Sequence, residues 1–76
     1  MNVWLLFTGS TEGGEAVAGP FNGIDLDGGC ITHSLTGEIV ATHGGALERW
    51  LYKDVWYEYV TVHAGTLESP WGERGR

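Results

Sequence analysis

Apolar side chains along the chain occur in short runs that glycine and polar residues separate. The clearest runs read VWLLF near the N-terminus, CIT and IVAT in the middle, and VWYEYVTV towards the C-terminus. Such runs of β-branched and aromatic residues are typical of strands, because these side chains pack well on a pleated sheet. The pattern therefore predicts strands over 3–8, 30–34, 38–43 and 55–63. A short strand is also predicted over 15–21, at a sheet edge or strand end, because Pro20 cannot donate a backbone hydrogen bond.

Turn signals between the later runs predict hairpins. LTG at 35–37 offers glycine for a tight turn, Gly44-Gly45 follows, and Lys53-Asp54 is a weaker third turn. If each turn has two residues, the strand pairing follows by counting along the chain. The expected pairs are Cys30–His43, Val40–Arg49, Arg49–Glu58, Trp50–Tyr57, Leu51–Trp56 and Leu47–Val60. Opposite-charge, aromatic and apolar pairs stabilise antiparallel neighbours, so the counting favours a β-meander.

A helix over 46–53 is the competing prediction. Ala46, Leu47, Trp50 and Leu51 form an apolar stripe at helical spacing, and the segment is rich in good helix formers. Against the helix, Gly45 is the only available cap, and a β-branched, aromatic run begins at Val55. The predicted fold class is therefore mainly β, a small single-domain antiparallel sheet or meander. The alternative is an α+β fold with one short helix near 46–53.

The length of 76 residues leaves room for one domain. We expect a compact domain over 1–68 and an irregular tail over 69–76. Cys30 is the only cysteine, so no disulfide can form within the chain, which favours a reducing compartment. No basic residue precedes the apolar run at 3–7, and no segment approaches the roughly 20 apolar residues that cross a bilayer. We therefore expect no signal peptide and a cytoplasmic location.

The net charge of the chain limits which classes of partner it can bind. Four basic residues stand against ten acidic ones, a formal net charge of −6. Binding to phosphates requires clustered Lys and Arg, and the sequence contains no such cluster. We therefore expect no direct nucleic-acid partner and no membrane partner. An acidic surface suits solubility or a protein partner with a basic surface.

Cys30, His33, His43 and His63 are the candidate metal ligands. Their spacing matches no regular zinc pattern. The expected pairing also brings Cys30 beside His43, as in a nucleophile and its base, but no cation that would activate the thiol is apparent nearby. We expect no metal, no other cofactor and no enzymatic activity. A small Cys–His enzyme or a metal-binding protein is kept as an alternative.

The stretch RWLYKDVWYEYVTV at 49–62 concentrates large aromatic side chains. In the expected register, the aliphatic face of the sheet is the core and comprises Ile31, Leu35, Val40 and residues 47, 51, 56, 60 and 62. The opposite face carries the candidate binding residues Trp50, Tyr52, Tyr57 and Tyr59, with Glu48 beside them. Tyr and Trp are enriched at protein–protein hot spots. The alternative is that the N-terminal segments cover these rings and make them a second core layer.

The opening NVWLLFTG and the late strand WYEYVTV resemble the ends of small accessory proteins that bacteriophages encode. The resemblance implies a protein that acts by binding a host or viral component. From the residues themselves we expect a small, acidic, non-enzymatic protein-binding module that acts through its Trp/Tyr-rich face, with a homodimer as the simplest assembly. An alternative is a phage-encoded inhibitor of a host defence or host enzyme that acts by direct protein binding.

Overall fold

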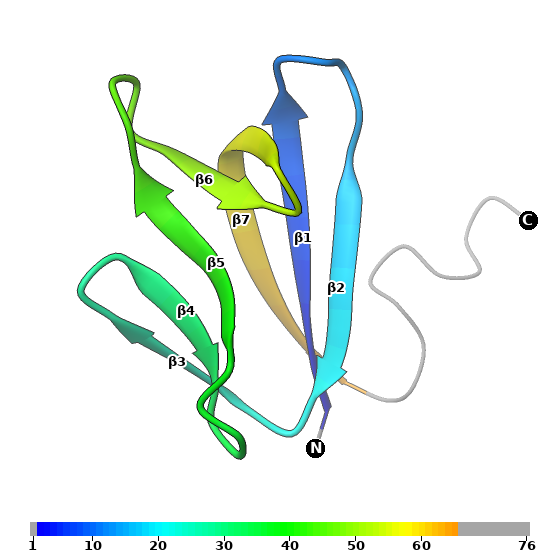
Figure 1. Cartoon of the computed structure of the whole chain (residues 1–76). Helices are drawn as coiled ribbons and strands as arrows, with labels where there is room; N and C mark the ends of the chain where they lie inside the picture. The colour runs from blue at the N-terminus through cyan, green and yellow to red at the C-terminus, as the bar shows by residue number, and fades with distance from the viewer. Residues whose placement is uncertain (1, 66–76) are drawn as a thin grey trace, which may run out of the picture.

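The computed structural model describes residues 2–65, and every regular element in that range is a β-strand. The strands are β1 (Asn2–Ser10), β2 (Ala16–Phe21), β3 (Ile24–Asp27), β4 (Cys30–His33), β5 (Ile39–Gly44), β6 (Arg49–Tyr52) and β7 (Val55–Gly65). All neighbouring strands pair antiparallel in one sheet (Figure 1). The prediction of a small antiparallel β domain is therefore confirmed, and the strand predicted over 15–21 lies at a sheet edge.

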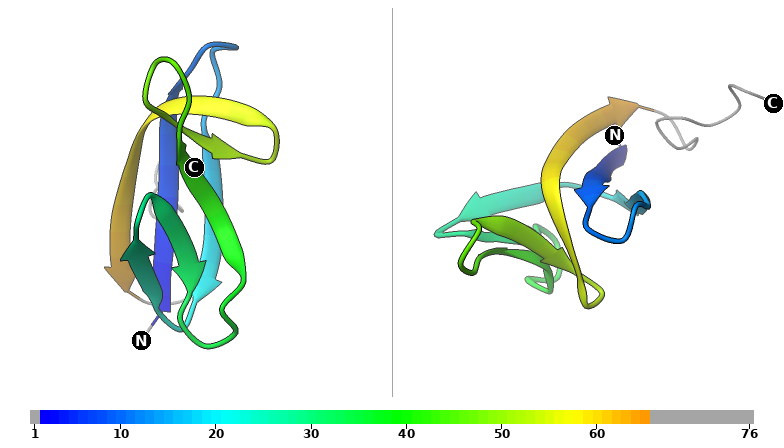
Figure 2. Two further views of the ribbon diagram at one scale, coloured as in Figure 1. Left: turned by 60° about the vertical axis from the view of Figure 1, so that its left-hand side comes forward. Right: turned by 90° about the horizontal axis from the view of Figure 1, so that it is seen from above.

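The strand order makes the sheet curl. The order is β2-β1-β7-β6-β5-β4-β3, so β2 and β3 form opposite edges. Only Asn22 and Gly23 join these two strands along the chain. A connection this short brings one end of each edge strand to the same corner of the molecule, as Figure 1 shows. The sheet is consequently an open, rolled structure with an inner and an outer face (Figure 2).

Strand β7 bends where it changes partner. It pairs with β6 over 55–57 and with β1 over 57–65, and Tyr57 lies opposite both Trp50 and Ser10. The adjoining residue of β1, Gly9, has a φ of 77°. A Cβ at Gly9 would lie 2.9 Å from the Cβ of Glu58, so glycine permits the close approach of the two strands here. Figure 2 shows the resulting curvature of β7.

The core lies on the inner face. Its buried side chains are Leu5, Phe7, Ala18, Ile31, Ala41 and Tyr57. The Phe7 ring stacks on Tyr52 with centroids 4.5 Å apart and lies 5.4 Å from the Tyr57 centroid. Such aromatic pairs contribute about 0.5–1.5 kcal/mol each beyond the area they bury. The rings therefore join β1 to β6 and β7 across the inside of the curl.

The expected pairing is correct next to the β6–β7 turn and wrong elsewhere. Trp50 pairs with Tyr57 and Leu51 with Trp56, and the Arg49–Glu58 ion pair forms at 3.4 Å. The other expected pairs, Cys30–His43, Val40–Arg49 and Leu47–Val60, do not form. Cys30 pairs with Thr42, Arg49 with Gly44, Val60 with Phe7, and Leu47 lies in a turn.

The alternative of a helix over 46–53 is not adopted. Residues 45–48 form a turn, and strand β6 follows directly. The turn is closed by a hydrogen bond from the Glu48 N–H to the Gly45 carbonyl at 3.2 Å. Glu48 has a φ of 55°, in the left-handed region, which a right-handed helix cannot pass through.

Two further expectations concern the ends of the chain and the membrane. The irregular tail predicted over 69–76 lies outside the described residues. Within 2–65, no helix is long and apolar enough to cross a membrane.

Candidate functional site

The predicted binding residues do not form one exposed surface. Tyr57 is only 6% exposed and belongs to the core, whereas Tyr59 is 62% exposed. Trp50 and Tyr52 are half-buried and pack against the core. Glu48 is exposed in the turn before β6. The expectation of a shared Trp/Tyr surface is therefore corrected, because three of the four rings lie inside the curled sheet.

The predicted core face is corrected in the same way. Of its aliphatic members, Ile31 is fully buried, but Leu35, Leu47 and Val62 are exposed. Trp56, which was assigned to that face, is 38% exposed. Large apolar side chains that the sequence pattern assigns to the interior are therefore exposed, in the connections at 34–38 and 45–48 (Leu35 and Leu47) and on β7 (Trp56 and Val62).

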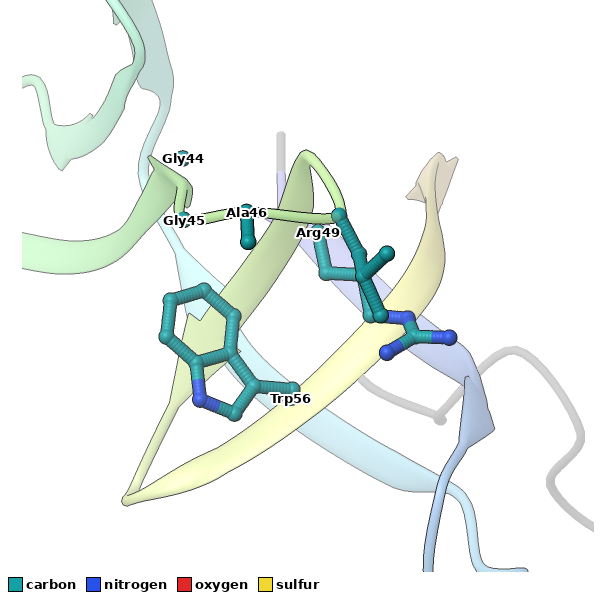
Figure 3. Close-up of a pocket in the computed structure, with 6 residues that line it drawn as sticks. Gly44, Gly45, Ala46, Arg49 and Trp56 are labelled. Atoms are coloured by element: carbon teal, nitrogen blue, oxygen red, sulfur yellow. The ribbon is translucent and has the colours of Figure 1, made fainter.

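Two of these exposed side chains line one depression, which we call the Leu47–Trp56 surface. It has a volume of about 250 Å³ and is lined by Gly44, Gly45, Ala46, Leu47, Arg49 and Trp56. Figure 3 shows the Trp56 indole beneath Gly45 and Ala46, with Arg49 on the other side of the depression. The lining residues come from the end of β5, the turn at 45–48, the start of β6 and the start of β7.

Gly45 determines how closely the turn lies over the indole. Its φ is 81°, and a Cβ there would lie 3.1 Å from Cη2 of Trp56. The backbone conformation therefore favours glycine, and the space above Trp56 is tight for any side chain. With a side chain at position 45, the turn or the Trp56 ring would have to shift by a few tenths of an ångström.

His43 holds the same turn from the strand that precedes it. Its Nε2 lies 3.0 Å from the Glu48 carbonyl oxygen, and because a carbonyl only accepts, Nε2 carries the proton in this contact. The His43 ring also lies against Trp50, with centroids 4.7 Å apart. His43 thus connects the turn that carries Leu47 to the half-buried Trp50 ring.

Arg49, the charged member of the surface, pairs with Glu58 on β7. Nη2 of Arg49 lies 3.4 Å from Oε2 of Glu58, and the two side chains are 21% and 48% exposed. An exposed pair of this kind adds at most about 1 kcal/mol to stability. Its larger effect is to place a donor group and a carboxylate beside an apolar depression.

The candidate metal ligands are dispersed. Cys30 pairs with Thr42, His43 with Trp50, and the His63 ring contacts the Thr61 hydroxyl at 2.9 Å. The expected Cys30–His43 neighbour pair is therefore wrong. In the part of the chain that the structure describes, no group of three or more His, Cys, Asp or Glu side chains is arranged to hold a metal ion.

Comparison with known proteins adds no functional information. No protein-family model, no curated protein and no solved structure matches the chain. The surface of this small, curled, antiparallel β domain is therefore the source of its functional clues. On that surface, the sequence reasoning missed Leu47 and Trp56. Gly44-Gly45 is the signal that could have found Leu47, because the turn at 45–48 that follows Gly44 leaves Leu47 outside the strands.

Proposed function

We propose that the chain is a small, acidic, non-enzymatic protein-binding module and that the Leu47–Trp56 surface is its contact. The observation that carries the proposal is the exposure of Leu47, at 66%, beside a partly exposed Trp56 in a single depression. Clustered exposed apolar side chains are a common mark of a protein-interaction site. The arrangement supports a contact that becomes buried when a partner binds.

The composition of the surface resembles that of an interface centre. Trp and Arg are among the residues most enriched at hot spots, and here Trp56 and Arg49 line the same depression. Burying an exposed leucine side chain contributes about 1.5–3 kcal/mol when it becomes fully enclosed. Leu47 and Trp56 would supply most of the affinity, and Arg49 with Glu58 would supply orientation.

The charge of the chain favours a partner with a basic surface. Ten acidic residues and a net charge of −6 attract such a partner over long range and raise its association rate. Self-association into a homodimer is the simplest assembly, because a two-fold contact would bury the same apolar depression on both copies. The solitary Cys30 suits action in the cytoplasm, where thiols stay reduced.

Paired variants of equally exposed leucines test the proposal. Leu47→Asp adds a charge to the depression, whereas Leu35→Asp adds the same charge at a position that is 72% exposed and lies in the β4–β5 connection. We expect both variants to fold like the wild type. Cross-linking in lysate through a photoreactive amino acid at position 47, but not at position 35, should yield a defined adduct. The Leu47→Asp variant should compete for that partner at least about tenfold less well than the wild type.

Two results would contradict the proposal. Equal cross-linking from positions 47 and 35 would show that the depression has no special role. Equal competition by the two aspartate variants would show that apolar contact at Leu47 does not contribute to binding. Light scattering of the purified protein distinguishes a homodimer from a foreign partner.

A further inference from the structure

The edge formed by β3 lacks the proline and the irregular pairing found at the other edge of the sheet. Among residues 2–65, β3 pairs only with β4. At the opposite edge, β2 contains Pro20, which has no N–H to offer, and its ladder with β1 is irregular. Proline and irregular pairing are common means of blocking an edge strand. The β3 edge has neither of them.

The backbone of β3 presents two residues outward. The Ser34 N–H donates to the Gly23 carbonyl at 3.0 Å, which makes these two residues a hydrogen-bonded pair. Because such pairs alternate along an antiparallel ladder, Asp25 and Asp27 direct their backbone groups towards β4. The N–H and C=O groups of Ile24 and Leu26 therefore point away from the sheet.

The side chains of β3 differ on the two faces. Leu26 lies directly opposite Ile31, which is 0% exposed, so Leu26 faces the inner side of the sheet. Yet Leu26 is 66% exposed, since no strand lies beyond it in the described part of the chain. Asp25 and Asp27 are exposed on the outer side. An inward leucine left open at a free edge is the position that one more strand would cover.

We propose that the β3 edge binds an extended segment of a partner protein as an additional antiparallel or parallel strand. The segment carries Lys or Arg on its outer side, against Asp25 and Asp27, and an apolar side chain on its inner side, against Leu26. Backbone hydrogen bonds to Ile24 and Leu26 supply affinity, and the alternation of basic and apolar side chains supplies specificity. This edge is separate from the Leu47–Trp56 surface and does not depend on it.

A basic segment fits the edge better than a second copy of the chain. Pairing β3 with another β3 would place Asp25 and Asp27 close to the same acids of the other copy. Like charges on neighbouring strands are destabilising. The two acids therefore disfavour self-pairing at this edge and favour a partner of opposite charge.

Two peptides of the same composition test the proposal by NMR titration of the full chain. The peptide KTKVKTK alternates basic and uncharged side chains, whereas KKTVTKK has the same charge without the alternation. We expect KTKVKTK to shift the amide resonances of 24–27 and to slow exchange of the Leu26 N–H. KKTVTKK should bind at least about tenfold more weakly, because it cannot place its charges and its valine on opposite faces at once.

Variants of β3 separate backbone pairing from charge attraction. Leu26→Pro removes the outward N–H of residue 26 but breaks no hydrogen bond to β4, so the fold should persist. We expect this variant to bind KTKVKTK at least about tenfold more weakly than the wild type does. Leu26→Val keeps the N–H and an apolar side chain and should bind like the wild type. The double variant D25N/D27N should bind KTKVKTK several-fold more weakly than the wild type, and this binding should depend much less on salt concentration.

The proposal is overturned if the two peptides bind equally, or if Leu26→Pro, shown to be folded by its NMR spectrum, binds KTKVKTK as the wild type does. It is also overturned if the Leu26 N–H is already protected without peptide, since a second copy or another part of the chain would then occupy the edge. Leu47→Asp should leave KTKVKTK binding unchanged. Failure at one surface is therefore distinguishable from failure at the other.

Discussion

Replacing Tyr57 and Tyr59 separately by alanine tests whether the aromatic stretch is interior or surface. The two tyrosines lie two residues apart on β7, yet Tyr57 is 6% exposed and Tyr59 is 62% exposed. Tyr57 packs against the Phe7 ring, whereas Tyr59 projects from the sheet. Simple alternation along a strand would place both side chains on one face, so the prediction depends on the bend in β7.

The expected difference follows from the exposed fractions. The exposed areas of Tyr57 and Tyr59 differ by a little over half of the surface of a tyrosine, which is about 110 Å² of roughly 200 Å². At about 25 cal/mol per Å², Tyr57→Ala should lower the free energy of unfolding by about 3 kcal/mol more than Tyr59→Ala. A domain of this length is stabilised by about 4–11 kcal/mol in total, so the difference is large enough to measure.

Urea denaturation followed by far-UV circular dichroism measures both variants on one scale. Tyr57→Leu serves as a milder replacement and should lose less stability than Tyr57→Ala, because it retains part of the buried volume. Equal losses for the two alanine variants would refute the buried placement of Tyr57. A larger loss at Tyr59 would show that β7 presents the opposite face to the core.

Three further outcomes are expected. Gly45→Ala should destabilise the fold more than Gly13→Ala in chemical denaturation. Both positions have positive φ, but a Cβ at Gly45 would lie 3.1 Å from Trp56, whereas nothing lies within 4 Å of a Cβ at Gly13. Equal losses of stability would mean that Trp56 does not restrict the turn. A double-mutant cycle on Arg49 and Glu58 should give a coupling below about 1 kcal/mol that shrinks as salt is added, and a larger, salt-insensitive coupling would contradict an exposed pair. Thermal unfolding midpoints should agree with and without chelator and reductant, and a drop of several degrees on chelation would indicate a bound metal.

Strands β1, β2, β4, β5 and β7 could be predicted from the sequence because their signals are local. β-branched and aromatic runs bounded by glycine mark β1, β4, β5 and β7, and Pro20 indicates that β2 is an edge strand. The β6–β7 hairpin was also predictable, since Lys53-Asp54 forms a two-residue turn with φ values of 50° and 67°. Such a turn determines its own register.

The face assignments were not predictable because they depend on connection lengths. The β4–β5 connection spans 34–38 rather than two residues, and Cys30 consequently pairs with Thr42 instead of His43. A slip of one residue moves every side chain of a strand to the other face relative to its neighbour. Ile31 therefore joins the same face as Ala41 and Tyr57, and the aromatic face becomes the core.

The distribution of pairing across the sheet explains why binding and stability can be altered separately. The β1–β7 ladder covers 2–10 of β1, and these two strands carry Leu5, Phe7 and Tyr57 of the core. In contrast, the β5–β6 ladder covers only 42–44, and β3 pairs along four residues at an edge. Long, buried ladders open only with global unfolding, whereas short exposed hairpins open locally. Amide exchange should therefore be slowest in β1 and β7. Both proposed contacts, at the β5–β6 turn and at the β3 edge, lie on these shorter ladders, so the surface variants Leu47→Asp and D25N/D27N should leave the β1–β7 core folded.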